Sequence, residues 1–509
     1  MQDLLNFPPV PDRDFITLGE RNGDIVHVPA DRYEETKLPG YPDVSLSKDF
    51  LRVSQENSAP LFLAHEETLC KKALNAWYET GLSEALAVLN RDDGAPSLVS
   101  AVASGILTVI RWAKSIHPLI SKLTLSTDDI INQYSSPTNW SPGIICSFAW
   151  HPHALKFAYA LIDDSVKVHT GGMSLVPILR TKLQKNVIDL AWQPFSSSVL
   201  AVACRSCILI WHVEPMSLAE RPSASCVQIL QQDHHSPVSS LGWSPSGHLL
   251  LSASPIDTAV MVWNVAMEAV VPLRRIGGGG NTMVCWSPDG FRVMSATPAS
   301  VFRVWQTKTW GCDKWTLPSG RCQTACWSPD GSTLLFATDA EPLVYAVTFS
   351  TNKEAGTVGG NRTAEVFLDL SLVSLTSSLD EDIKIGGCVQ SLVWDPTGSR
   401  LALLFKESFG CKKNLIAVFR TTKSPSLKAT PCGWVKGEEG DSAQFICFKP
   451  KFQDGALLTV VWSSGRISQV PFYFLVPDKI SSGGPLQMAP QFGPQPDCLL
   501  FSSAMSDLD

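Results

Sequence analysis

A hexapeptide of reactive residue types occurs twice in this chain. The sequence Cys-Trp-Ser-Pro-Asp-Gly spans Cys285–Gly290 and again Cys326–Gly331, and the copies start 41 residues apart. Cysteine, serine and aspartate could form a duplicated nucleophilic site, but such a site needs a positioned base or a metal beside the nucleophile. Neither copy is accompanied by one, so the repetition favours duplicated scaffold. Phosphorylation of the serines in the Ser-Pro pairs stays open.

A Cys-x2-Cys pair and a His-Pro-His triplet could bind a metal. A zinc site needs a second ligand pair, and a redox site needs a helix that begins at the motif. Cys204 and Cys207 instead lie between two apolar runs predicted as strands, which favours a tight hairpin. His151 and His153 fall in a predicted turn, where a surface turn is preferred over a ligand pair. We predict no metal site.

The sequence contains no complete phosphate loop and no nucleophile elbow. Gly277–Gly280 lacks the Gly-Lys-Ser/Thr that completes a phosphate loop, and it precedes a predicted strand instead of a helix. Gly242–Gly247 has the wrong spacing for a Gly-x-Ser-x-Gly elbow. The sequence therefore predicts no catalytic residue, no cofactor and no enzymatic activity.

The hexapeptide belongs to a longer repeat in which an aromatic residue precedes x-Pro. Successive aromatic positions are 42, 51, 43, 41, 67 and 54 residues apart, and a unit of about 40–45 residues is the period of a four-stranded propeller blade. We predict that these seven positions are structural and end the first strand of each blade. They are Trp150, Trp192, Trp243, Trp286, Trp327, Trp394 and Phe448.

Each repeat has the same internal order. An apolar run leads to the aromatic residue, proline then removes a backbone donor, and a glycine turn such as Asp289-Gly290 follows. A third apolar run ends in another aromatic residue, as Trp211 follows Trp192 after 19 residues. These runs do not alternate in polarity, as expected of strands covered on both faces. The predicted fold class is all-β: a WD40-like β-propeller of seven blades over residues 140–478.

The WD40 pattern is degenerate. The third strands lack the aspartate that follows the tryptophan, and the Gly-His signature is missing except for His235, eight residues before Trp243. The hydrogen-bonded Asp/His network of WD40 blades is therefore in doubt here, whereas the blades themselves are not.

Four segments follow from the remaining sequence. Residues 1–30 predict an extended segment with a hairpin around Asn22-Gly23, which could add a strand to the ring. Residues 60–135 have helical spacing and predict a helical segment packed on the propeller, with a short helix beginning near Ser126. The extra residues near 348–387 predict an exposed loop. Residues 479–509, rich in Gly, Pro, Ser and Gln, predict a disordered tail.

Composition limits the classes of partner. The chain has 509 residues, 14 cysteines and a net charge of -7, so no direct nucleic-acid partner is expected. Residues 94–110 form the longest uncharged stretch of the first half, and a membrane span needs about 20 mostly apolar residues. We expect no membrane span and no signal peptide. Scattered cysteines favour reduced thiols in the cytosol or nucleus.

Several stretches resemble the Aladin family of WD-repeat nucleoporins. The resemblance extends to about residue 478 and implies a non-enzymatic scaffold of the nuclear pore complex at the nuclear envelope, on its cytoplasmic side. The implied partners are a transmembrane-ring nucleoporin, through which the chain is anchored, and other nucleoporins. Protein and mRNA transport and a role at mitotic spindle poles are also implied. The stretches are Phe7–Pro9, Thr138–Ser141, Cys146–His153, Asp163–Val168, Val199–Trp211 and Gly320–Gly331.

Two other functional classes, a propeller enzyme and a ubiquitin-ligase adaptor, are alternatives to the scaffold. A propeller enzyme would need carboxylates or metal ligands that converge on the central channel, and the turns show no such set at matching blade positions. A substrate adaptor of a ubiquitin ligase would carry a ligase-docking module, which the N-terminal helices do not suggest. No family binding residue maps onto this chain, and we expect the anchoring contact on residues 60–135 and the adjoining propeller surface.

Overall fold

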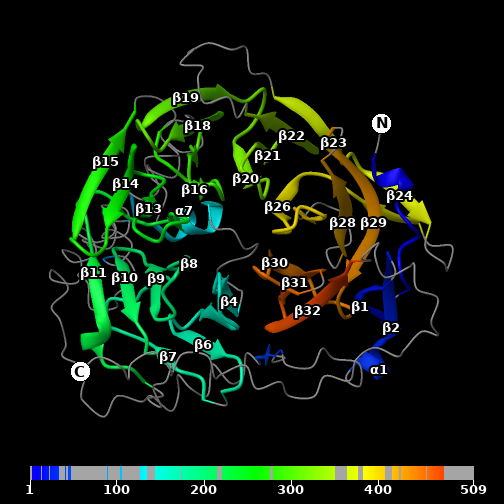
Figure 1. Ribbon diagram of the computed structural model, residues 1–509, viewed down its shortest axis with the longest axis horizontal. Coiled ribbons are helices and arrows are strands. Elements are labelled where there is room, and N and C mark those ends of the chain that lie inside the picture. The colour runs from blue at the N-terminus through cyan, green and yellow to red at the C-terminus, as the bar shows by residue number, and fades with distance from the viewer. Residues whose placement is uncertain are drawn as a thin grey trace, which may run out of the picture.

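The computed structural model is a closed ring of antiparallel sheets (Figure 1). Seven large sheets surround the centre of the ring, so the predicted all-β propeller of seven blades is confirmed. The structure describes residues 3–12, 14–21, 23–33, 41, 44–46, 89, 102, 104–105, 127–134, 144–173, 175–214, 221–275, 279–349, 364–376, 382–406, 415–423, 426–453 and 455–474.

The first six blades are four-stranded sheets in which successive strands pair from the inner to the outer rim. Blade one is β4 (Ile145–Trp150), β5 (Lys156–Leu161), β6 (Val166–Thr170) and β7 (Ile178–Leu179), and blade two is β8 (Asp189–Trp192), β9 (Val199–Ala203), β10 (Ile208–His212) and β11 (Val227–Leu230). Blade three is β12 (Ser240–Trp243), β13 (Leu250–Ala253), β14 (Ala259–Asn264) and β15 (Ala269–Arg274), and blade four is β16 (Met283–Trp286), β17 (Arg292–Ala296), β18 (Val301–Gln306) and β19 (Gly311–Thr316). Blade five is β20 (Cys322–Trp327), β21 (Thr333–Thr338), β22 (Leu343–Thr348) and β23 (Glu365–Asp369), and blade six is β26 (Val389–Trp394), β27 (Arg400–Phe405), β28 (Leu415–Thr422) and β29 (Lys428–Lys436).

The seventh blade joins segments from the two ends of the chain. Its inner strands are β30 (Ala443–Phe448), β31 (Gly455–Trp462) and β32 (Arg466–Tyr473). Strand β1 (Phe15–Arg21) lies parallel to β32 with Glu20 opposite Phe472, and β2 (Asp24–Pro29) pairs antiparallel with β1. A short strand, β3 (Val44–Ser45), pairs with the start of β32. The N-terminal hairpin therefore supplies the outer strands of the last blade and closes the ring.

The unbroken apolar runs of the sequence become strands that neighbouring blades cover on both faces. Every residue of β9 and of β31 is buried. At the outer rim, β15 and β19 instead mix exposed and half-buried residues. Polarity returns there because an outer strand has solvent at its free edge and on part of its faces. The hydrophobic core is thus a series of layers between blades.

The glycine of each hexapeptide turn has a backbone that other residues rarely adopt. Gly290 and Gly331 have φ angles of 75° and 70°, which only glycine adopts at no steric cost. A Cβ atom at Gly331 would also lie 2.6 Å from the Cγ atom of Asp289 in the previous blade. The turn chemistry read from the sequence therefore also sets how closely adjacent blades approach.

An N-terminal segment packs against blades five and six at the rim. The 3-10 helix η1 (Asp3–Asn6) contacts β23, β29 and the strand β24 (Val373–Thr376), as Figure 1 shows near the N label. Leu4 and Phe7 are buried there at 0% and 7% exposure. The segment is held because its apolar side chains enter the gap between the outer strands of two blades.

The expectation of an exposed loop near 348–387 is wrong for the described part of that range. It contains β23, the fourth strand of blade five, and a hairpin of β24 with β25 (Asp382–Ile385). Val373, Ile383 and Ile385 of this hairpin are buried in the same cluster as Leu4. Spacing alone could not reveal this, because the apolar face of the hairpin is covered by residues more than 350 positions away.

Few helices are described. Besides η1, they are α1 (Ala30–Tyr33), η3 (Ala224–Cys226) and α7 (Thr127–Tyr134), which lies near the centre of the ring in Figure 1. Helix α7 occupies the place where the sequence predicts a short helix. Most of the predicted helical segment 60–135, and the predicted tail 479–509 in full, lie outside the described residues. Within the described part of the chain, no helix is long and apolar enough to cross a membrane.

Candidate functional site

The structure places all seven aromatic positions at the end of the first strand of a blade. Four of the tryptophans donate the indole N–H to the backbone of the previous blade, and in each case the acceptor is the residue before that blade's own tryptophan. The bonds are Trp192 to Ala149 O (3.2 Å), Trp243 to Ala191 O (3.1 Å), Trp286 to Gly242 O (3.0 Å) and Trp327 to Cys285 O (3.2 Å). These residues therefore link neighbouring blades.

The remaining three positions depart from this pattern. Trp150 donates to the Thr459 hydroxyl of blade seven at 2.8 Å. Trp394 donates to the Thr421 hydroxyl of its own blade at 3.0 Å. The Phe448 side chain has no N–H group that could donate such a bond. The regular bond is absent at the joints between blades five and six, six and seven, and seven and one. The first two of these joints have the longest spacings, 67 and 54 residues, whereas the 51-residue spacing before Trp243 keeps the bond.

The two hexapeptides make the contacts of turns. The Ser287 hydroxyl donates to Asp289 and accepts the Arg292 N–H at 2.9 Å, and Ser328 makes the equivalent bonds in its own turn. Ser287 and Ser328 are 0% and 1% exposed. Burial raises the pKa of the Cys285 thiol to about 12. The serine hydroxyls are thus engaged and shielded from a kinase, and the cysteine is a neutral packed residue.

Blade three contains a Ser-His-Asp hydrogen-bond chain that sequence reasoning did not predict. His235 lies 2.8 Å from Asp257 Oδ2 through Nδ1 and 2.8 Å from the Ser252 hydroxyl through Nε2. Trp263 donates its indole N–H to the same hydroxyl at 2.8 Å. Despite partial burial, hydrogen bonds from His235 and from the Ala259 N–H lower the pKa of Asp257. In the sequence, the one sign of this hydrogen-bond chain is His235, the single trace of the Gly-His signature.

This arrangement has the connectivity of a catalytic triad but lacks access. Ser252 is 0% exposed and His235 is 3% exposed. A catalytic serine must reach substrate and have oxyanion donors around the reacting carbon. Here the hydroxyl already bonds an indole and an imidazole inside one blade, so the chain of bonds fixes the packing of blade three.

The Cys-x2-Cys pair lies in the turn between β9 and β10, as the sequence predicts. The Cys204 N–H donates to Cys207 O at 2.9 Å, and both side chains are buried. No group of three or more His, Cys, Asp or Glu residues that could hold a metal occurs in the described ranges. The pair therefore has the contacts of a hairpin turn there.

The sequence predicts that His151 and His153 lie in a surface turn. This is wrong for His151, which is buried, whereas His153 is exposed. His151 is only 3% exposed, and its Nδ1 accepts the N–H groups of His153 and Ala154 at 3.1 and 2.9 Å. Its Nε2 therefore carries the proton and donates to Ser196 O at 2.9 Å. Burial lowers the pKa of His151. The ring is a neutral turn-forming group that contacts the next blade.

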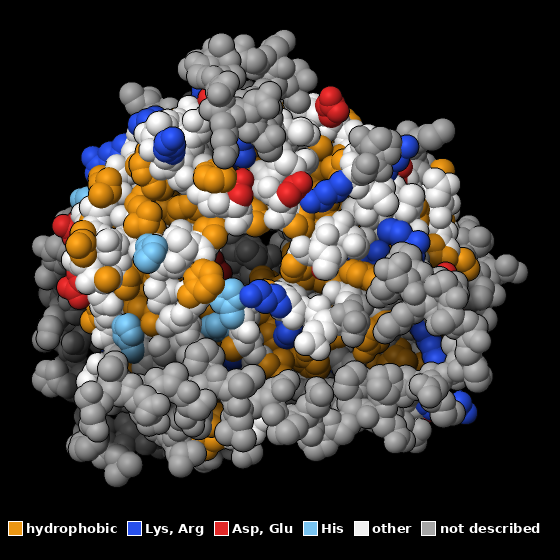
Figure 2. Space-filling view, viewed as in Figure 1, with side chains coloured by type: hydrophobic (Ala, Val, Ile, Leu, Met, Phe, Trp, Pro, Cys, Tyr) orange, Lys and Arg blue, Asp and Glu red, His pale blue; other side chains and the backbone are white. Residues whose placement is uncertain are grey.

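Exposed hydrophobic side chains recur in the turns after the first strands. Leu155, Phe195 and Phe291 are 39%, 76% and 64% exposed, and the His153 ring stacks on Phe195 with centroids 4.6 Å apart. Because all first strands run in the same direction through the ring, these turns share one face. Figure 2 shows one face of the ring, where hydrophobic side chains are spread over the surface and histidines lie in the left half of the view. This turn face offers apolar contact points to a partner.

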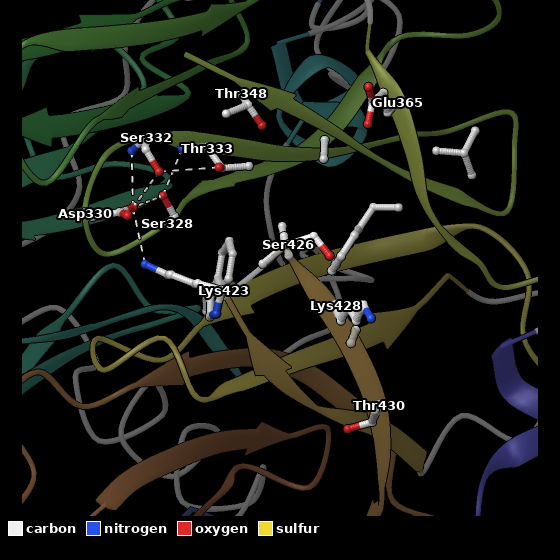
Figure 3. Close-up of a pocket in the computed structure, with 16 residues that line it drawn as sticks. Ser328, Asp330, Ser332, Thr333, Thr348, Glu365, Lys423, Ser426, Lys428 and Thr430 are labelled. Carbon is white, nitrogen blue, oxygen red and sulfur yellow. Dashed lines mark hydrogen bonds and ion pairs between the residues drawn. The ribbon is translucent and has the colours of Figure 1, made fainter. Parts of the chain in front are cut away.

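A groove between blades five and six has a lining of mixed polar and apolar side chains. It encloses about 740 Å³ between the outer strands β23 and β29 (Figure 3). Lys423 forms an ion pair with Asp330 at 3.2 Å in this groove. Partial burial opposes ionisation of Asp330, but hydrogen bonds from Ser328, Ser332 and Lys423 hold its pKa well below the usual value. The groove has no paired acid and base at a water-shielded position, so it suits binding.

Comparison with known proteins agrees with the ring. The Aladin seven-bladed propeller family matches residues 126–473, which run from α7 to the end of β32. A curated relative, Aladin from Arabidopsis thaliana, is 29% identical over 382 residues, covering 70% of this chain and 83% of the relative. Coronin-7 from Bos taurus is 29% identical over 124 residues, covering 24% of this chain and 13% of that protein.

Two solved structures show a weaker likeness. The β-propeller domain of Cps50 (Swd1) from Myceliophteria thermophila is 15% identical with a TM-score of 0.48, and the match covers 64% of this chain and 96% of that one. A chain of the mitotic checkpoint complex is 16% identical with a TM-score of 0.47, covering 66% and 92%. The family match covers well over half of the 509 residues, and the chain belongs to the Aladin family of seven-bladed propellers.

Proposed function

We propose that this protein is a non-enzymatic scaffold of the nuclear pore complex. The family match carries this proposal, because it spans α7 and every strand from β4 to β32, which includes strands of all seven blades. The site chemistry supports it: Ser252 and His235 are sealed inside a blade, and Ser287 and Ser328 are engaged in turns. A rigid ring with accessible rim and turn faces is suited to holding partners.

Anchoring by a membrane-spanning nucleoporin is the second part of the proposal. The described end of the predicted segment 60–135 is helix α7, and Arg321 holds this helix on the ring. The guanidinium donates to Gln133 O at 2.9 Å and lies 4.8 Å from the Tyr134 ring centroid. The anchoring contact would be made by the segment 60–135, of which α7 is the described end, together with the adjoining propeller surface.

Deletion of residues 60–126 tests the anchoring surface while it keeps α7 on Arg321. The full chain should co-purify with the membrane-spanning nucleoporin from nuclear envelopes, and the deletion variant should not. Circular dichroism and thermal melting should show that the ring of the variant remains folded. Deletion of residues 480–509 serves as the matched control and should keep the partner. Retained binding by the 60–126 deletion would refute this anchoring surface.

The cellular role follows from the same proposal. The protein would reside on the cytoplasmic side of the pore, support transport of protein and mRNA, and move to spindle poles in mitosis. Proximity labelling with the tagged full chain should enrich pore proteins in interphase and spindle-pole proteins in mitosis. Depletion should slow a nuclear import reporter. Enrichment of ubiquitin-ligase subunits over pore proteins would instead favour a substrate adaptor.

A further inference from the structure

The groove between blades five and six is filled at one end by the chain itself. Strands β23 and β29 form its two walls. Towards their C-terminal ends, at Asp369 and Trp434, residues 3–10 occupy the gap, and Leu4 and Phe7 are buried between the two blades. Towards the N-terminal ends of the same strands, the cavity of about 740 Å³ is open (Figure 3). We call this open part the lower groove.

The filled end shows how these walls hold a peptide. The Trp434 indole donates to Pro8 O at 2.9 Å. The Asp369 N–H, on the free edge of β23, donates to the Asp3 carboxylate at 2.8 Å. One wall thus binds a backbone carbonyl and the other binds an acidic side chain. Both are interactions that a segment of another protein could repeat further along the same two strands.

The lower groove is lined by both hydroxyl groups and apolar side chains. Ser332, Thr348 and Thr430 line it, together with Val366, which is 58% exposed. Ser332 already donates its hydroxyl proton to Asp330 at 2.9 Å, and Thr430 donates to Arg420 O at 3.4 Å. Their oxygens remain as acceptors for the N–H groups of an extended backbone. The volume lies within the range of about 300–1,000 Å³ that is common for ligand sites.

The charges on the two walls are opposite in sign. Lys423 and Asp330 neutralise each other at 3.2 Å. Lys428 on β29 and Glu365 on β23 are exposed and have no ion-pair partner within the described ranges. Figure 3 shows them on different sides of the opening. The best complement is therefore a segment with one acidic and one basic side chain.

We propose that the lower groove binds an extended peptide of a partner protein, which presents an acidic side chain to Lys428 and a basic side chain to Glu365. The hydroxyl oxygens of Ser332 and Thr430 accept N–H groups of its backbone, and an apolar side chain packs on Val366. The proposal does not depend on the pore role, because it rests on the groove alone.

Peptide selection on the intact protein tests the proposal. The probe is a phage library of random 12-residue peptides, selected on the immobilised full chain, and synthetic copies are measured by fluorescence anisotropy. For at least one selected peptide, Lys428→Glu should weaken binding about tenfold or more, since the new carboxylate would face the acidic side chain of the peptide. Lys314→Glu is the matched control: it lies on β19, the outer strand of blade four, is also exposed, and should leave affinity unchanged.

A charge exchange separates specific recognition from general loss of positive charge. The Lys428→Glu, Glu365→Lys double variant should bind the peptide whose acidic and basic residues have been exchanged, with an affinity within about threefold of the original pair. All variants are first matched by thermal melting. A library that yields no peptide sensitive to Lys428→Glu, or peptides equally sensitive to Lys314→Glu, overturns the proposal.

Discussion

Replacement of Glu20 by glutamine should loosen the closure of the ring. Glu20 lies on β1, and both of its carboxylate oxygens bind the guanidinium of Arg400 at the start of β27, with Arg400 Nε to Oε2 at 2.7 Å. The two side chains are only 1% and 6% exposed. The Arg400 guanidinium also lies 4.7 Å from the centroid of the Phe474 ring. The pair therefore ties the N-terminal strand to blade six beside the end of the described chain.

The expected cost follows from the burial of the charge that remains. Removing one partner of a buried ion pair typically costs about 3–5 kcal/mol, because the other charge is left uncompensated. Arg420 lies 3.8 Å from Glu20 but is itself a cation, so it cannot compensate the charge of Arg400. We expect about 3 kcal/mol for Glu20→Gln, because the amide retains one hydrogen-bond acceptor.

Hydrogen exchange of the β1 amides is the suitable assay, since a chain of 509 residues need not unfold in one step. A loss of about 3 kcal/mol corresponds to roughly 100-fold faster exchange in β1. Arg180→Gln is the control: its pair with Asp163 spans 3.9 Å and Arg180 is 59% exposed, so the effect should stay below about 1 kcal/mol. Adding Arg400→Gln to Glu20→Gln should recover part of the loss.

Unchanged exchange in β1 of the Glu20→Gln variant would refute the reasoning. So would a double variant whose loss equals the sum of the two single losses, because additive losses would mean that the two side chains do not interact.

Three further predictions concern joints within and between blades. Trp243→Phe removes the bond to Ala191 O and should cost about 1 kcal/mol at this joint, measured as roughly fivefold faster hydrogen exchange of the β12 amides. His235→Leu leaves Asp257 and Ser252 without their hydrogen-bond partner and should cost at least about 2 kcal/mol. The largest increase in hydrogen exchange should lie within blade three. Burial, with the nearby Lys167 charge, lowers the pKa of His169 to about 4 in the folded protein. In the unfolded chain the His169 imidazole takes up a proton below about pH 6.5. The folded state therefore loses stability as the pH falls from about 6.5 to about 4. Melting between pH 6.5 and 4 should consequently be less pH-sensitive in His169→Gln than in the wild type.

The architecture was predictable because its signals are local. The aromatic residue, the proline and the turn glycine lie within a few residues of one another, and each acts on the strand end where it stands. Trp192 and Trp243, for example, end their strands where the repeat places them. Seven such units of similar length leave few alternatives to a ring.

The site chemistry was less predictable because it depends on which side chains become sealed. His151 reads as a surface turn residue, yet it is buried against Ser196 of the next blade. The doubtful Asp/His network is complete in blade three, where the aspartate, Asp257, comes from a turn instead of following the tryptophan. Sequence spacing cannot show that a side chain from another turn completes a hydrogen-bond chain.

By itself the sequence determined the blade unit, the turn chemistry and the family likeness, since these depend on neighbouring residues. Only the tertiary structure decided how the ring closes, with β1 beside β32 and Glu20 on Arg400, 380 positions away. It also decided that residues 3–10 fill one end of a groove and leave the other open. Such contacts carry no local signature, because a long loop closes at an entropic cost that is nearly independent of its sequence.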